Sequence, residues 1–134
     1  MNGEKAVVTD RRDPLKVAFG LGSSHSGVHH WWVQRVTAAA LVVLGIWFVL
    51  LVLRLLGADY ATARAALAQP WNALLMIAFT LTMFWHAVLG LRVVIEDYIH
   101  TRWVEVFALV AVYFLAVIGA LASVLAVLRI ALTP

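Results

Sequence analysis

The chain has 134 residues, of which 64% are hydrophobic and 13% are charged, with a formal net charge of +3 and no cysteine. A soluble domain has roughly 25% charged residues, so this composition predicts an integral membrane protein without a separate soluble catalytic domain. The lack of cysteine excludes a disulfide, a thiolate nucleophile and a cysteine-ligated iron–sulfur cluster within this chain, so any such centre must lie in a partner.

The N-terminal segment, residues 1–35, is predicted to form a polar arm, because Asp13-Pro14 and the stretch GLGSSHSG are loop signals. Three apolar runs follow, and each can supply the about 20 helical residues that cross a hydrocarbon core. Backbone groups in lipid must be hydrogen-bonded within the protein, so these runs are expected to be helices. The sequence therefore predicts an all-α membrane protein with transmembrane helices at 36–56, 71–95 and 104–130.

Two loops connect the predicted transmembrane helices. The first, residues 57–70, is expected to hold one helical turn near 61–67, with Pro70 at the start of the second helix. The second loop covers residues 96–105. The arm is too long and the first apolar run too extended for a secretory signal peptide, so we expect both to remain in the protein.

The distribution of Lys and Arg predicts the orientation of the chain in the membrane. If the arm and the second loop share one side, that side holds seven of these residues and the other side three: Lys5, Arg11, Arg12, Lys16, Arg35, Arg92 and Arg102 against Arg54, Arg64 and Arg129. Cytoplasmic segments carry the positive excess, so we expect a cytoplasmic N-terminus. Topology thus accounts for the net charge, and without a basic soluble module we expect no nucleic-acid binding. No Arg/Ser-rich, acid-poor transit segment precedes the arm, which favours a bacterial inner membrane.

His86 is the only ionisable residue deep within a predicted span. It shares one helical stripe with Gly90 and Asp97, at spacings of three and four residues. A neutral imidazole is a good axial ligand for haem iron, and Gly90 would leave room for a flat macrocycle. Hydrogen bonding to a neighbouring helix and proton relay are alternatives, and Gly90 could instead allow close helix packing. If His86 binds haem, the second ligand must come from another chain, because no other histidine lies at that depth.

Polar groups also gather at the predicted inner surface. Tyr98 lies roughly 18 Å along the helix axis from His86. Its phenol can donate a hydrogen bond to a quinone carbonyl, and Asp97 can orient it or carry protons. The structural alternative is that Tyr98 is one of the tyrosines common at membrane interfaces and that Asp97 pairs with Arg92 or Arg102. Arg35 can bind a haem propionate or act as one more positive anchor.

Three histidines, His25, His29 and His30, precede the first apolar run. Three imidazoles could suggest a metal site. We do not expect one, because no cysteine or carboxylate completes a ligand set.

Two stretches together resemble the small hydrophobic membrane anchor subunits of succinate dehydrogenase, respiratory complex II. They are GVHHWWVQRVTAAAL at 27–41 and HAVLGLRVVIEDY at 86–98, and the resemblance covers most of the chain from about residue 26. It implies three spans with the N-terminus inside. It also implies a lipid-embedded complex with a separate cytochrome b subunit (b556), an iron–sulfur subunit and a flavoprotein subunit.

The resemblance also implies roles for individual residues. His86 matches the family's axial ligand to haem b, the other ligand coming from the cytochrome b subunit. Tyr98 matches the family's ubiquinone-site tyrosine, with Asp97 beside it, and Arg35 matches an arginine near the haem propionates and the quinone pocket.

One further position in the family motif matches His29, near the quinone or haem. Some family members have an aspartate next to that histidine, where this chain has His30. The proton-handling role of this pair is therefore left open by the resemblance.

The implied function is that of a membrane anchor. Electrons from succinate oxidation would reduce ubiquinone at the inner surface, with haem b nearby, as part of the respiratory chain and the tricarboxylic acid cycle. The chain alone would have no catalysis, because it carries neither flavin nor clusters. Two alternatives remain: the anchor of a quinol:fumarate reductase, and a non-redox three-helix assembly subunit in which His86 is a packing residue.

Overall fold

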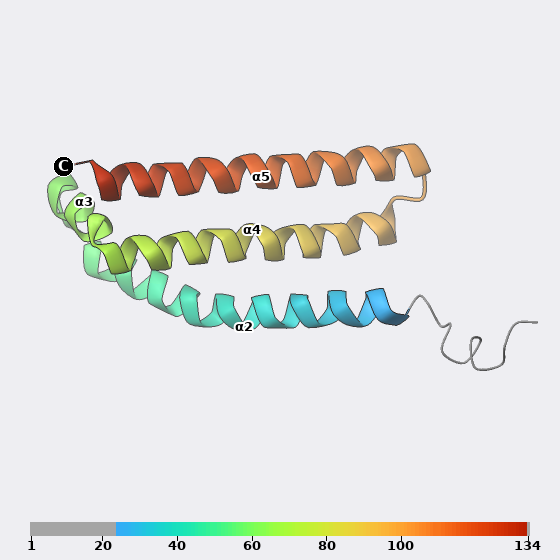
Figure 1. Cartoon of the computed structure of the whole chain (residues 1–134), viewed down its shortest axis with the longest axis horizontal. Coiled ribbons are helices and arrows are strands. Elements are labelled where there is room, and N and C mark those ends of the chain that lie inside the picture. Colours follow the sequence, from blue (N-terminus) through green and yellow to red (C-terminus); the bar gives the residue numbers. More distant parts are fainter. Residues whose placement is uncertain (1–23, 134) are drawn as a thin grey trace, which may run out of the picture.

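The computed structural model describes residues 24–133, and side chains from residue 28 onward. This part of the chain forms four helices: α2 (Ser24–Leu55), α3 (Tyr60–Ala68), α4 (Pro70–Tyr98) and α5 (Arg102–Leu132) (Figure 1). Residues 24–133 contain no strand, so the predicted all-α class is confirmed. Most of the predicted polar arm lies outside the described residues.

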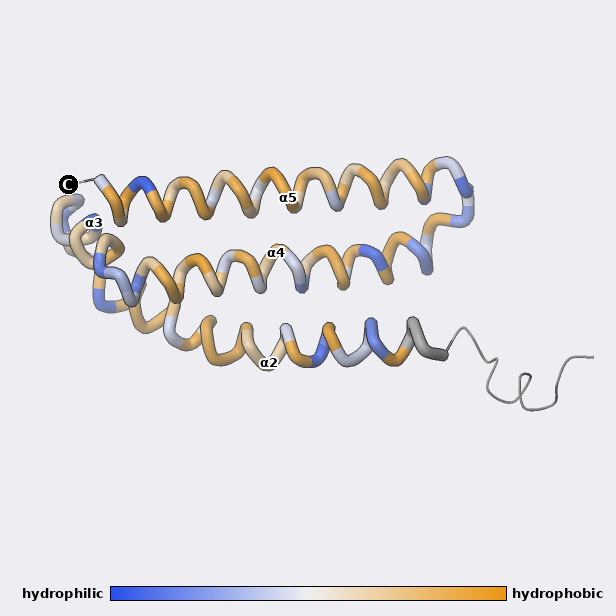
Figure 2. Tube along the Cα trace, viewed as in Figure 1, coloured by the Kyte–Doolittle hydropathy of each residue, from blue (hydrophilic) through white to orange (hydrophobic). Residues whose placement is uncertain are grey.

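Three of these helices are long and apolar enough to cross a membrane: Val28–Leu55 within α2, Pro70–Tyr98 and Arg102–Leu132. The predicted three transmembrane helices are therefore confirmed. At 1.5 Å per residue, a 28-residue helix is about 42 Å long and extends beyond a hydrocarbon core of about 30 Å. Figure 2 shows apolar residues along all three helices, with many of the hydrophilic residues towards their ends.

The three long helices form a single layer. α4 lies in the middle, with α2 packed on one side of it and α5 on the other, and α3 lies across the ends of α4 and α5 (Figure 1). Because α2 and α5 do not close over α4, few side chains are buried, and these are Leu51, Ala73, Thr80, Val88, Leu89 and Ile95. Both broad faces of the layer are left for lipid or for another protein chain.

Aromatic rings and glycine set the spacing within the layer. Phe48 of α2 stacks on Phe79 of α4, with ring centroids 4.9 Å apart and an interplanar angle of 14°. Between α4 and α5, a Cβ placed on Gly119 would lie 2.7 Å from two ring carbons of Phe84. Gly119 is thus the position at which α5 makes room for the Phe84 ring.

The helices extend beyond the apolar runs that predicted them. α2 begins at Ser24, within the segment expected to be arm, and the second loop shrinks from the expected 96–105 to three residues, 99–101. A helix satisfies its own backbone groups in water as well as in lipid, so the edge of an apolar run marks the membrane surface and not the helix end. An ion pair from Arg92 Nε to Glu96 Oε1 at 2.7 Å, spaced i to i+4, supports the polar end of α4.

The connection between α2 and α4 is helical over nine residues rather than one turn. Asp59 caps α3, because its carboxylate accepts a hydrogen bond from the Thr62 backbone N–H at 3.1 Å. Hydrogen bonds from the hydroxyl and backbone N–H of Thr62 hold the pKa of Asp59 below its ordinary value. Pro70 is the first residue of α4, as predicted. The Arg64 side chain donates to the Thr133 carbonyl oxygen at 2.7 Å, which links α3 to the end of α5.

Candidate functional site

His86 faces α2 from the middle helix of the layer. Its Nδ1 lies 2.9 Å from Oγ1 of Thr37, a hydrogen-bonding distance between two helices. The same hydroxyl oxygen lies 2.8 Å from the Val33 carbonyl oxygen and 3.1 Å from that of Gln34. The imidazole is partly buried and has a defined partner within the chain.

A cavity of about 310 Å³ lies beside this histidine. Its lining residues come from both helices, and they are Trp31, Gln34, Arg35, Ala38 and His86. The Arg35 guanidinium carbon lies 5.3 Å from the centroid of the Trp31 ring, within the range of a cation–π interaction. Two of the predicted site residues, His86 and Arg35, therefore line one cavity, which combines an imidazole with a permanent positive charge.

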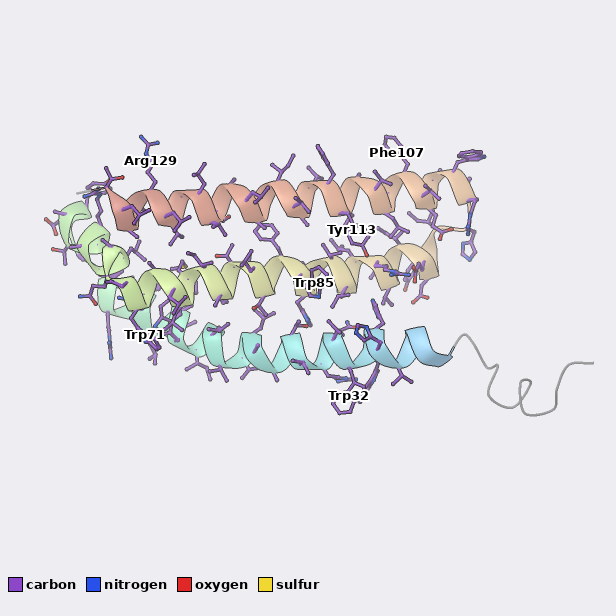
Figure 3. All side chains as sticks on the ribbon, in the orientation of Figure 1. Trp32, Trp71, Trp85, Phe107, Tyr113 and Arg129 are labelled. Carbon is purple, nitrogen blue, oxygen red and sulfur yellow. The ribbon has the colours of Figure 1, made fainter. Side chains whose placement is uncertain are left out.

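One tryptophan, Trp31, lines this cavity, and Trp32 and Trp71 lie outside it. Trp31 meets Trp32 edge to face, with centroids 5.2 Å apart and an interplanar angle of 84°. Figure 3 shows Trp32 pointing outward from α2, and Trp71 towards the opposite end of the layer. Both rings are exposed, Trp32 to 58% and Trp71 to 69%, as expected of anchors in the two interfacial regions.

Gly90 lies one turn beyond His86 on α4. A Cβ added there would meet no other atom within 4 Å, apart from the helix backbone around it. Close packing between the described helices therefore does not require glycine at this position, in contrast to Gly119. The surface over Gly90 is open to a group from outside the described chain.

Tyr98 and Asp97 lie at the end of α4, away from the His86 cavity. Tyr98 is 79% exposed and Asp97 is also exposed, and neither lines the cavity. Arg92 pairs with Glu96 and not with Asp97, which was one of the two arginine pairings that the structural alternative allowed. The structure places these two residues at the same end of the layer as the start of α2 but does not bring them together with His86 and Arg35 (Figure 1).

The histidines at the start of α2 differ in exposure. His29 is exposed, whereas His30 is partly buried, and its Nε2 has no hydrogen-bond partner among the described residues. The side chain of His25 lies outside the described residues. Between residues 24 and 133, no group of three or more His, Cys, Asp or Glu side chains is placed to hold a metal ion.

Thr37 and Gln34 are site residues that the sequence reasoning missed. A signal was present: His30, Gln34 and Thr37 are spaced by four and three residues and so form one polar stripe at the start of an apolar helix. Such a stripe indicates a helix face turned towards a polar partner. The interaction with His86 could not be deduced, because the pairing of two helices is not encoded in the periodicity of either.

The fold and the cavity define a class: a multi-pass membrane subunit in which one histidine and one arginine line a cavity between two of the spanning helices. The chain matches the family described as succinate dehydrogenase/fumarate reductase transmembrane subunit over residues 9–120. The chain belongs to this family, and the identification as an anchor subunit from the two sequence motifs is confirmed. The role of membrane anchor follows, as does a multi-pass membrane location.

Three bacterial relatives illustrate the match, each named succinate dehydrogenase hydrophobic membrane anchor subunit. The protein of Rickettsia bellii (strain RML369-C) is 33% identical over 118 residues, 88% of this chain and 94% of the relative. The protein of Paracoccus denitrificans is 38% identical over 85 residues, 63% of this chain and 66% of the relative. The protein of Rickettsia conorii (strain ATCC VR-613 / Malish 7) is 31% identical over 121 residues, 90% of this chain and 96% of the relative. No solved structure matches the chain.

Proposed function

We propose that this subunit anchors the flavoprotein and iron–sulfur subunits of a succinate dehydrogenase in a bacterial inner membrane, and supplies half of a haem b site and part of a ubiquinone site. The observation that carries the proposal is the cavity between α2 and α4, which His86 and Arg35 line together. An imidazole can bind iron, and a guanidinium can bind the carboxylate of a propionate. The resemblance of the two sequence motifs to the family implies the same roles for these two residues.

The residues around the cavity fit one side of a haem. His86 offers one axial ligand, Arg35 offers a positive charge on the neighbouring helix, and Gly90 leaves the surface of α4 open. When bound, the haem supplies one-electron chemistry at a potential that its axial ligands help to set. The other histidine ligand would come from the cytochrome b subunit, which would cover the open face of the layer.

The quinone role rests on the end of α4. Tyr98 presents an exposed phenol that can donate a hydrogen bond to a quinone carbonyl. Asp97, which Arg92 does not neutralise, can accept or deliver the proton that accompanies quinone reduction. His29 lies at the start of α2, at the same end of the layer. Because Tyr98 and Asp97 are exposed in this subunit, partner chains would have to enclose the quinone.

The proposed orientation places this end on the cytoplasmic side. The start of α2 and the loop between α4 and α5 lie at one end of the layer, and α3 lies at the other (Figure 1). The sequence assigns seven Lys and Arg residues to the first end and three to the second. This asymmetry supports a cytoplasmic N-terminus. The relatives are named for succinate dehydrogenase, which supports succinate oxidation over fumarate reduction as the direction.

A difference spectrum of the purified complex tests the haem proposal. The tagged subunit is solubilised in detergent with its partners, and dithionite-reduced and oxidised spectra are compared. We expect a b-type α-band that His86→Ala removes, whereas His100→Ala, an exposed histidine in the α4–α5 loop, leaves it unchanged. A colourless preparation without dehydrogenase partners would instead favour the non-redox assembly subunit.

A further inference from the structure

We propose that Thr37 is a positioning residue that fixes the tautomer of His86, so that Nδ1 carries the proton and Nε2 keeps a free lone pair. This inference rests on the proposed haem site for its purpose, since a free Nε2 is the nitrogen that iron would bind. Its geometry stands on the chain alone. The hydroxyl of Thr37 lies 2.9 Å from Nδ1 of His86, across the contact between α2 and α4.

Counting protons around the hydroxyl assigns the direction of this hydrogen bond. A threonine hydroxyl has one hydrogen to donate and two lone pairs to accept with. The carbonyl oxygens of Val33 and Gln34, 2.8 Å and 3.1 Å away, can only accept. Two oxygens at 2.8 Å need a hydrogen between them, so the hydroxyl hydrogen points to Val33.

The remaining hydrogen must come from the histidine. The Thr37 hydroxyl donates its hydrogen to the Val33 carbonyl oxygen, so its oxygen can only accept a hydrogen bond from His86. Nδ1 of His86 must therefore carry the N–H that donates to this oxygen. A neutral imidazole has one N–H, so Nε2 is then unprotonated. Donation to the carbonyl also makes the hydroxyl oxygen a better acceptor, because hydrogen bonds in a chain polarise one another.

The membrane makes this arrangement effective. Water is excluded from the hydrocarbon core, so little competes with Thr37 for the imidazole N–H. Metal-ligating histidines commonly donate their second N–H to an acceptor, which fixes the ring orientation and raises the basicity of the ligating nitrogen. A hydroxyl on the neighbouring helix, itself bonded to the backbone, supplies such an acceptor without adding a charge to the membrane interior.

Nitrogen NMR of the full chain in detergent tests the tautomer directly. The chain is labelled with 15N-histidine, and the His86 signals are assigned by their loss in His86→Ala. We expect a protonated Nδ1 and a pyridine-type Nε2 in the wild type, retained in Thr37→Ser. In Thr37→Val, which keeps the branched shape but removes the acceptor, the Nε2-protonated form should appear. A wild type with protonated Nε2, or identical His86 signals in Thr37→Val, would overturn the inference.

A matched control separates this role from helix packing. Thr82 lies one turn before His86 on α4, and its hydroxyl donates only within its own helix, to the Ala78 carbonyl oxygen at 2.8 Å. Thr82→Val removes a hydroxyl from a similar environment and should leave the His86 signals unchanged. A change as large as that in Thr37→Val would show that the signals report packing and would overturn the inference.

The assembled complex provides a second readout. Weakening the hydrogen bond at Nδ1 lowers the basicity of the ligating nitrogen. Thr37→Val should therefore shift the haem midpoint potential upward and weaken haem retention about 10-fold, while Thr37→Ser restores both. An unchanged potential and retention in Thr37→Val would contradict a role at the metal. A wild-type complex without haem would refute the proposed function, whereas the tautomer is still decided by the NMR experiment.

Discussion

Gly119→Ala is expected to weaken the packing of α5 against α4. The new Cβ would lie 2.7 Å from two ring carbons of Phe84. Carbon atoms in contact prefer about 3.5–4.0 Å, so the ring or the helix must move by about 1 Å. Overpacking of this kind costs about 1–3 kcal/mol, while replacing glycine with alanine inside a helix returns up to about 1 kcal/mol. The net loss in the free energy of unfolding therefore lies between about 0 and 3 kcal/mol.

The matched control is Gly45→Ala in α2, where an added Cβ meets no atom within 4 Å. It carries the same helix-propensity gain without the clash, so the free energies of unfolding of the two variants should differ by about 1–3 kcal/mol. Detergent-titration unfolding, followed by circular dichroism, measures this difference. Phe84→Leu should relieve the clash and recover most of the loss in the double variant. Equal stability of Gly119→Ala and Gly45→Ala would refute the reasoning.

Three further outcomes are expected. Gly90→Ala should leave the stability of the chain intact but lower the haem content of the complex, measured by the α-band per mole of protein, since nothing in the chain occupies that surface. Tyr98→Phe should raise the KM for ubiquinone about threefold to tenfold in quinone-reductase assays, because the variant loses one hydrogen bond to the quinone. Tyr60→Phe, at the opposite end of the layer, is the control. Because the pKa of Asp59 is lowered, its capping contribution to stability is present above about pH 4 and is lost as the pH falls through the folded-state pKa. Hydrogen exchange of the α3 amides should accelerate over that acidic range in the wild type but not in Asp59→Asn.

The membrane architecture was predictable from the sequence because lipid imposes a simple rule. Apolar runs of sufficient length must be helices, so three spans and the start of α4 at Pro70 followed directly. The ends of the helices could not be predicted in the same way, because the end of an apolar run marks the membrane surface and a helix can continue beyond it. α2 begins at Ser24 and α4 ends at Tyr98, so both helices include polar residues that hydropathy alone assigns to the arm and to the loop.

The candidate site was predictable only in part. The position of His86 within a span could be predicted from one helix, since it depends on local sequence, whereas its role as a haem ligand stays a prediction. Its position beside Arg35 and Thr37 depends on how α2 pairs with α4, which no single-helix pattern specifies. The single-layer arrangement was also beyond reach, because three apolar helices can equally form a closed bundle.

This open layer explains why the subunit's polar groups remain incomplete within it. In residues 24–133, the partner that the chain offers His86 is Thr37, which on our proposal satisfies one of the two imidazole nitrogens. The second nitrogen belongs to a partly buried side chain beside a cavity, and a ligand that the covering chain brings would give it a partner. A ligand that binds only the folded layer stabilises it by mass action. The partner and haem that complete the site would therefore also hold α2 against α4. Assembly of the complex and stability of the anchor would then be linked through His86.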